Sequence, residues 1–128
     1  MDWGAEYKVG VERFDNHHQQ IADVIGRMEN MARQGGDAAA WSALLDEMIS
    51  IALAHFTEEE AELAKKDYPE LLEHQDEHRN LLNELFELAG RQKETGSGPS
   101  LEVAEFLANW MAVHVAETDM RYRGLFGG

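Results

Sequence analysis

Two short stretches decide the fold and the chemistry of this chain: His55-Phe56-Thr57-Glu58-Glu59 and His74-Gln75-Asp76-Glu77-His78. Residues four apart in an α-helix lie on one face, one turn apart. The first and last residues of each stretch can therefore point to one place, one pair from each of two helices. Imidazole and carboxylate together suit iron, zinc or manganese. The two stretches predict two helices that share a metal site.

The composition limits what kind of site this can be. The chain has 128 residues, of which 44% are hydrophobic, and it has no cysteine. This length supports one hydrophobic core, so we expect a single domain spanning residues 1–128. Without cysteine there is no disulfide, no thiolate zinc site and no cysteine-ligated iron–sulfur cluster. Histidine and carboxylate must supply the metal ligands.

The charge excludes several classes of partner. Lys and Arg number 11 against 25 Asp and Glu, which gives a formal net charge of -14. Phosphate would repel such a chain, so we expect no nucleic-acid partner and no binding to anionic membranes. No apolar run approaches the roughly 20 residues of a membrane span, and no charged-then-apolar leader follows Met1. We expect a cytoplasmic protein that is a monomer or weak homo-oligomer.

Apolar residues recur in steps of three and four along four segments, which is typical of amphipathic helices. Short connections between them predict an all-α, up-down-up-down antiparallel four-helix bundle. An irregular N-terminal arm over residues 1–12, with Trp3, Tyr7, Val9 and Val11, should lie across it and bury its aromatic rings. The expected helices run from Glu12 or Phe14 to Gln34 before Gly35, from an N-cap at Asp37 to about Lys65, from a first turn containing Pro69 to about Gln92, and from an opening at Pro99 past His114; the tail from Arg121 should be irregular.

Seven polar residues interrupt these apolar stripes at positions that keep the inward register. Their outward neighbours Glu58, Glu60, Glu62 and Glu77 should be surface charge, and we interpret His17, about 100° round the helix from His18, as a surface residue. The spacing of five before the last of the seven does not fit a regular helix, so either a bridging ligand tolerates it or a π-bulge corrects it. The seven are His18, His55, Glu59, His74, His78, His114 and Asp119.

Seven such residues in a bundle interior indicate a metal site. The alternative is a buried polar network without metal, and its desolvation cost would have no evident compensation. Seven ligands exceed one tetrahedral zinc. They suit two six-coordinate ions bridged by both carboxylates, with the histidines divided three and two. An additional oxo or hydroxo bridge would leave one coordination position open for a small molecule. Because the set is rich in neutral imidazole and poor in carboxylate, it favours reversible two-electron chemistry over substrate oxidation.

These residues resemble the hemerythrin family, and more closely its bacterial single-domain members, the bacteriohemerythrins. The resemblance implies a non-haem di-iron centre that binds dioxygen reversibly: His74, His78 and His114 on one iron, His18 and His55 on the other, and Glu59 and Asp119 bridging. It covers almost the whole chain and is carried by Trp3, the Tyr7-Lys8-Val9-Gly10-Val11 arm, Phe14-Asp15-Asn16-His17-His18, the stretch 55–59, Tyr68-Pro69 before His74-x-x-x-His78, and Trp110-x-x-x-His114-x-x-x-x-Asp119.

Three further residues are predicted to line the oxygen pocket. Phe56 and Trp110 would form an apolar wall that excludes water, although both also fit simple core packing. Met111 stands where the family commonly has leucine. Methionine is longer, more flexible and oxidisable, so we hypothesise a reshaped or leakier pocket.

Three functions are open at this point. The leading one is a dioxygen carrier, store or sensor that is not an enzyme. The alternative is a di-iron enzyme, for instance a nitric oxide or peroxide reductase on the same bundle, which would consume its substrate. A third is a sensory module that moves a helix, which would need a separate partner.

Overall fold

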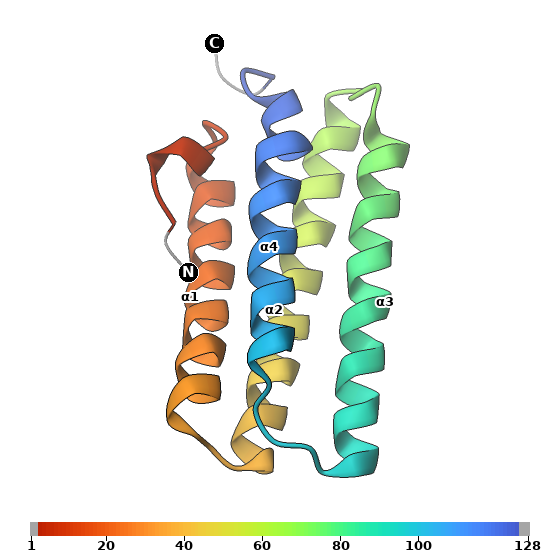
Figure 1. The fold of residues 1–128 in the computed structure, drawn as a ribbon. Helices are drawn as coiled ribbons and strands as arrows, with labels where there is room; N and C mark the ends of the chain where they lie inside the picture. The colour runs from red at the N-terminus through yellow and green to blue at the C-terminus, as the bar shows by residue number, and fades with distance from the viewer. Residues whose placement is uncertain (1–2, 126–128) are drawn as a thin grey trace.

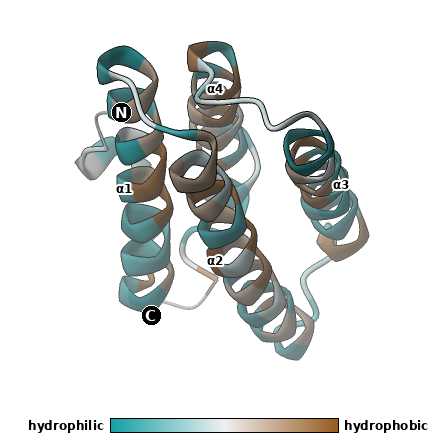
Figure 2. Ribbon diagram, turned by 90° about the horizontal axis from the view of Figure 1, so that it is seen from below, coloured by the Kyte–Doolittle hydropathy of each residue, from teal (hydrophilic) through white to brown (hydrophobic). Residues whose placement is uncertain are grey.

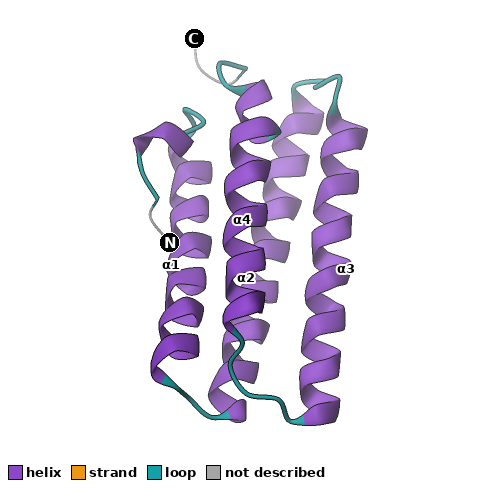
Figure 3. Ribbon diagram, in the orientation of Figure 1, coloured by secondary structure: helices purple, strands orange, loops and turns teal. Residues whose placement is uncertain are grey.

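The computed structural model describes residues 3–125, and these form four long helices packed side by side (Figure 1). Helices and loops account for all the described residues, with no strand among them (Figure 3). The predicted all-α four-helix bundle is therefore confirmed. Its elements are η1 (Ala5–Tyr7), α1 (Glu12–Gln34), α2 (Ala38–Lys65), α3 (Leu71–Thr95), α4 (Leu101–Glu117) and η2 (Asp119–Tyr122).

Consecutive helices run in opposite directions. The α1–α2 and α3–α4 connections lie at one end of the bundle, and the α2–α3 connection lies at the other (Figure 1). Helix α2 packs against α1 and α3, and α4 packs against α1, whereas α3 and α4 approach each other less closely. Among the described residues, no helix combines the length and the apolar character that a membrane crossing requires.

The apolar stripes form one core along the bundle axis. The brown, hydrophobic side of α1 turns towards α2 and α4 (Figure 2). Each fully buried large side chain contributes roughly 1.5–3 kcal/mol relative to an exposed one, so this core accounts for most of what holds the four helices together. Its most deeply buried members include Phe14, Ile25, Leu45, Leu85 and Leu107.

Side-chain caps fix where two helices begin. The Asp37 carboxylate accepts from the Ala40 backbone N–H at 2.7 Å, as predicted for the N-cap of α2. The Ser100 hydroxyl accepts from the Val103 N–H at 3.3 Å, so α4 begins at Leu101. The prediction that Pro99 opens this helix was wrong, because the serine that follows it provides the cap.

Helix α3 is displaced from its predicted range at both ends. Pro69 lies in a turn two residues before the helix and not in its first turn, because the Leu71 N–H bonds back to the Tyr68 carbonyl at 3.2 Å. The helix continues past Gln92 to Thr95 and ends where Gly96 adopts a left-handed conformation with φ of 68°. Glycine adopts this conformation without a Cβ penalty.

The N-terminal arm lies beside α1 and contacts α4 through η1. Val9 is fully buried, and its N–H donates to Asp15 Oδ1 at 2.8 Å. Trp3 and Tyr7 stack with ring centroids 4.2 Å apart but are only partly buried. The prediction that the arm buries its aromatic rings is thus only partly correct. The tail begins with η2 and not with irregular chain, and residues 126–128 lie outside the described residues.

Candidate metal centre

The structure brings all seven predicted ligand residues together near the end of the bundle that carries the arm. Each of the seven side chains is at most 4% exposed. Helix α1 supplies one histidine, α2 a histidine and a glutamate, α3 two histidines, α4 one histidine and η2 the aspartate. The inward register of each helix thus carries its polar residues to one place.

Three of the histidines gather on one side of the cluster. Glu59 Oε1 lies 2.6 Å from His74 Nε2 and 3.2 Å from His78 Nε2. Asp119 Oδ1 lies 3.0 Å from His74 Nε2 and 3.1 Å from His114 Nε2. These three histidines, with one oxygen from each carboxylate, form what we call the three-histidine half.

The other carboxylate oxygens face the remaining two histidines. Glu59 Oε2 lies 3.3 Å from His55 Nε2 and 3.8 Å from His18 Nε2. Asp119 Oδ2 lies 3.2 Å from His18 Nε2. This is the two-histidine half. Each carboxylate directs one oxygen to each half, which is the arrangement that a bridging ligand requires.

The spacing of five between His114 and Asp119 is explained by the end of a helix. Helix α4 stops at Glu117, and the Thr118 N–H bonds to the His114 carbonyl at 2.8 Å. Asp119 then begins the 3₁₀ turn η2. The tighter turn carries its carboxylate back to the cluster. The π-bulge that we considered is not formed.

Several buried oxygen and nitrogen atoms of the cluster make no hydrogen bond among the described residues. Both oxygens of Asp119, Nε2 of His18 and Nε2 of His55 have no hydrogen-bond partner among the described residues. They nevertheless lie 3.0 to 3.3 Å from atoms of opposite polarity. The ligand atoms of the three-histidine half all lie within 4.8 Å of one another, and so do those of His18, His55 and Glu59. A buried carboxylate is costly unless positive charge balances it, so this set of oxygen and nitrogen atoms fits cations held between the side chains.

In the metal-free protein, the buried carboxylates and histidines shift one another's pKa values. Burial raises the pKa of Asp119, and the Glu59 charge adds to that, but His114 and His18 outweigh both and hold it well below its ordinary value. Burial alone would lower the pKa of His18, yet Asp119 and Glu59 raise it to about 9. The same carboxylates raise the pKa of His74 to about 10 and of His114 to about 9 against the opposing effect of burial.

The comparison with known protein families identifies this arrangement. A family model described as "Hemerythrin HHE cation binding domain" matches residues 9–125. The chain belongs to the hemerythrin family. Its bundle matches a structure titled "Crystal structure of hemerythrin:wild-type" with a TM-score of 0.93 and 25% identity, covering 100% of this chain and 98% of the other.

Curated relatives cover nearly the whole chain. A bacteriohemerythrin of Methylococcus capsulatus is 26% identical over 123 residues, which are 95% of this chain and 93% of the relative. A myohemerythrin of Theromyzon tessulatum is 25% identical over 122 residues, 95% of this chain and 90% of the relative. The predicted family resemblance is confirmed, and the buried histidine and carboxylate cluster is consistent with a hemerythrin di-iron site.

Residues outside the seven also contact this hemerythrin centre, and the sequence analysis had placed three of them on the surface. The structure corrects those assignments. Glu60 Oε2 accepts from His78 Nδ1 at 2.7 Å, and Glu77 Oε1 accepts from His114 Nδ1 at 2.9 Å. His17 Nδ1 lies 2.9 Å from His55 Nδ1. Each of the three is next to a candidate ligand in the sequence: His17 precedes His18, Glu60 follows Glu59, and Glu77 precedes His78. Each contacts a histidine of another helix.

Tyr122 contacts a bridging carboxylate directly. Its hydroxyl donates to Glu59 Oε2 at 2.8 Å, and its side chain is 1% exposed. Burial and the nearby carboxylates raise the pKa of this hydroxyl far above its ordinary value, so it stays a donor. One feature of the sequence could have indicated Tyr122: it follows Asp119 by three residues and therefore lies on the same side of a 3₁₀ turn.

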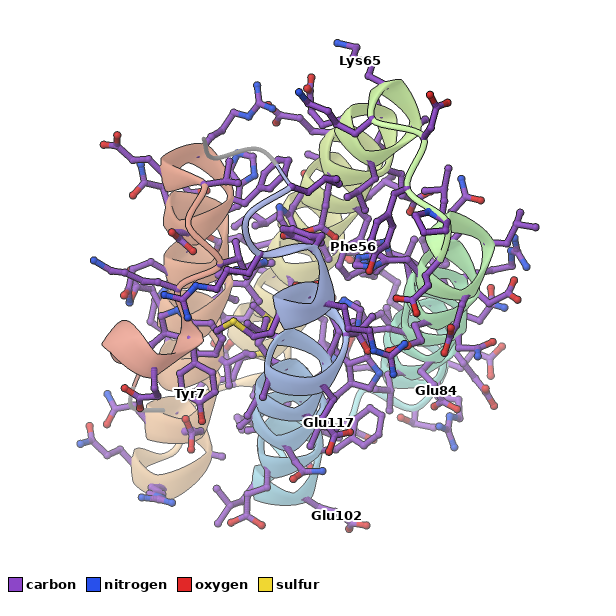
Figure 4. All side chains as sticks on the ribbon, turned by 90° about the horizontal axis from the view of Figure 1, so that it is seen from above. Tyr7, Phe56, Lys65, Glu84, Glu102 and Glu117 are labelled. Carbon is purple, nitrogen blue, oxygen red and sulfur yellow. The ribbon has the colours of Figure 1, made fainter. Side chains whose placement is uncertain are left out.

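The three predicted pocket residues differ in their surroundings. Phe56 is buried in the bundle interior (Figure 4) and stacks on His78 with ring centroids 3.8 Å apart. Met111 is buried at 2% exposure. Trp110 stacks on His114 at 4.4 Å but is partly exposed and lines an outer groove of about 260 Å³ with Glu77 and Phe106. Phe56 and Trp110 thus each stack on a histidine of the three-histidine half, and Trp110 also faces an outer groove.

Proposed function

We propose that this hemerythrin-family protein binds dioxygen reversibly at two iron ions and acts as a carrier or store, not as an enzyme. His74, His78 and His114 would hold one iron, and His18 and His55 the other. Glu59 and Asp119 would bridge the two. Iron is the metal that the family resemblance implies, and the imidazole-rich donor set suits it.

The unequal division of histidines is the observation that carries this proposal. The three-histidine half brings five ligand residues together. The two-histidine half brings together His18, His55 and Glu59, and Asp119 adds an oxygen 3.2 Å from His18 Nε2, so it would have four at most. A metal ion in the two-histidine half would therefore have one more coordination position open to a small molecule. A bound iron pair supplies the two electrons that dioxygen takes up on binding and gives back on release.

The chain's own residues would keep this exchange reversible. Phe56, which stacks on His78, presents apolar surface to the centre and would exclude water that promotes irreversible loss of electrons. Met111 is buried in the core and would add to this apolar surround. The Tyr122 hydroxyl holds Glu59 in position through a hydrogen bond to Oε2. Among the described residues, the two candidate metal groups contain no acidic residue other than Glu59 and Asp119.

An anaerobic optical titration tests the proposal. Iron-loaded, reduced protein is analysed for metal and then titrated with dioxygen while its visible spectrum is recorded. We expect two irons per chain and an absorption band that appears with oxygen and disappears under argon, over repeated cycles. Zinc-loaded protein serves as the control, because zinc has no redox chemistry and should show no band.

Two other results would change the conclusion. Two irons per chain with rapid oxidation and no reversible band would favour the reductase alternative, and consumption of nitric oxide or peroxide would then be measured directly. No iron bound after loading would contradict both functions.

A further inference from the structure

His17 is in contact with the two-histidine half, although it is not one of the seven candidate ligands. Its Nδ1 lies 2.9 Å from His55 Nδ1, and the two rings meet edge to face with centroids 5.0 Å apart. The His17 side chain is 21% exposed, so it lies between the centre and solvent. On the solvent side, His17 Nε2 lies 3.5 Å from Glu58 Oε2.

The direction of the hydrogen bond follows from which nitrogen of His55 faces the cluster. His55 Nε2 lies 3.3 Å from Glu59 Oε2 and would be the metal-binding atom. A neutral imidazole that binds metal through Nε2 carries its proton on Nδ1. His55 Nδ1 therefore donates to His17 Nδ1, and the His17 proton lies on Nε2, facing Glu58. Arg13 Nε in turn holds Glu58 Oε1 at 2.8 Å.

The two halves of the centre differ in this outer support. In the three-histidine half, His78 and His114 each donate to a carboxylate, Glu60 at 2.7 Å and Glu77 at 2.9 Å. Thr118 also donates to both oxygens of Glu77, at 2.8 and 2.9 Å, which fixes its position. The three-histidine half thus has two histidines oriented by anions.

Among the described residues, the two-histidine half has a single outer contact of this kind, and its acceptor is the neutral imidazole of His17. Nδ1 of His18 has no hydrogen-bond partner among the described residues, so only His55 is held from outside. A carboxylate raises the basicity of the histidine that it accepts from more than a neutral imidazole does. The two-histidine half should therefore hold its metal less firmly.

We infer that His17 is a positioning residue that holds His55 in its metal-binding orientation, so that it controls how firmly the two-histidine half retains its metal ion. The inference rests on the proposed metal centre but not on dioxygen binding. It assigns His17 no direct contact with metal or with dioxygen.

Release of cobalt(II) to a chelator tests this inference without dioxygen chemistry. Cobalt-loaded protein is mixed with excess EDTA, and loss of the cobalt absorption is followed over time. The unmodified protein should release its two ions in two phases, the faster one from the two-histidine half. His17→Leu should accelerate the faster phase by about 10- to 100-fold, the usual effect of losing such an outer contact, and leave the slower phase unchanged.

Two further variants separate positioning from a general effect on folding. His17→Gln keeps an acceptor for His55 Nδ1–H, so its release rates should stay near those of the unmodified protein. Glu60→Gln should accelerate the slower phase and not the faster one. If His17→Leu does not fold by circular dichroism, His17→Ser removes the same acceptor with a small polar side chain suited to partial exposure.

Three outcomes would overturn the inference: acceleration of both phases alike by His17→Leu, acceleration of neither, or equal effects of His17→Leu and His17→Gln. A protein that behaves as expected with cobalt, but shows no reversible dioxygen band with iron, would contradict the proposed function alone.

Discussion

Metal loading should release protons from the centre, and the number follows from the buried charges. In the metal-free protein the pKa values of His18, His74 and His114 are raised to about 9, 10 and 9, against the effect of burial, by Asp119 and Glu59. At pH 7 each of these rings is therefore ~99% protonated. Metal binding requires the neutral imidazole, so all three protons must leave.

The expected release is about three protons per chain at pH 7 and about two at pH 9, where the rings with a pKa of about 9 are already half neutral. The apparent metal affinity should rise with pH over this range. Burial lowers the pKa of His55, so this ring adds nothing to the count. A hydroxide bridge formed from water would release a further proton. Three protons per chain is therefore the minimum expected at pH 7.

Isothermal titration calorimetry of the metal-free protein with cobalt(II), in HEPES and in Tris, measures this number, because the difference in observed heat divided by the difference in buffer ionisation heat equals the protons released. Release of clearly fewer than three protons at pH 7 would refute the charge assignment. Equal release at pH 7 and pH 9 would refute the pKa values that the carboxylates impose.

Other consequences can be measured on the same protein. The raised histidine pKa values stabilise the metal-free fold fully below about pH 6.5, so its thermal midpoint should fall as pH rises from there through 9 to 10; a midpoint that rises instead would contradict the ion pairs. Tyr122→Phe removes a hydrogen bond to the buried Glu59 carboxylate and should lower the free energy of unfolding by about 2 kcal/mol in urea titrations, while an effect below about 0.5 kcal/mol would show that the contact is unimportant. Met111→Leu should slow autoxidation and dioxygen release in stopped-flow measurements, and unchanged rates would dismiss the hypothesis of a leakier pocket.

The sequence was sufficient for the fold because apolar periodicity and helix-ending residues agree along the chain. The stripe from Phe14 to Met28 and the stop at Gly35 predicted α1 closely, and the Asp37 cap did so for α2. The misplaced helix starts lie at Pro69 and Pro99. Proline's fixed φ suits the first turn of a helix and also the turn before it, so the residue alone could not distinguish the two.

Periodicity also identified six of the side chains that the structure brings together, since each keeps the inward register of its helix. Asp119, five residues after His114 and beyond the end of α4, did not follow from the register, and the family resemblance indicated it. Periodicity failed for His17, Glu60 and Glu77 for a geometric reason. A residue about 100° from the centre of the buried face lies neither in the core nor in open solvent, but along the line where two helices meet. Whether it contacts a neighbour there depends on the register between helices, which one helix's pattern does not contain.

The position of Asp119 beyond the end of α4 also sets the order in which a newly made chain can acquire metal. His18 emerges during synthesis long before Asp119, and at roughly 5–20 residues per second the interval is about 5–20 s. During that interval the emerging chain carries histidines but lacks the aspartate that joins both halves. The proposed metal centre is therefore complete only after the chain beyond α4 has been made. A ribosome-bound chain that stops before η2 should hold metal weakly, however many of its histidines have already folded.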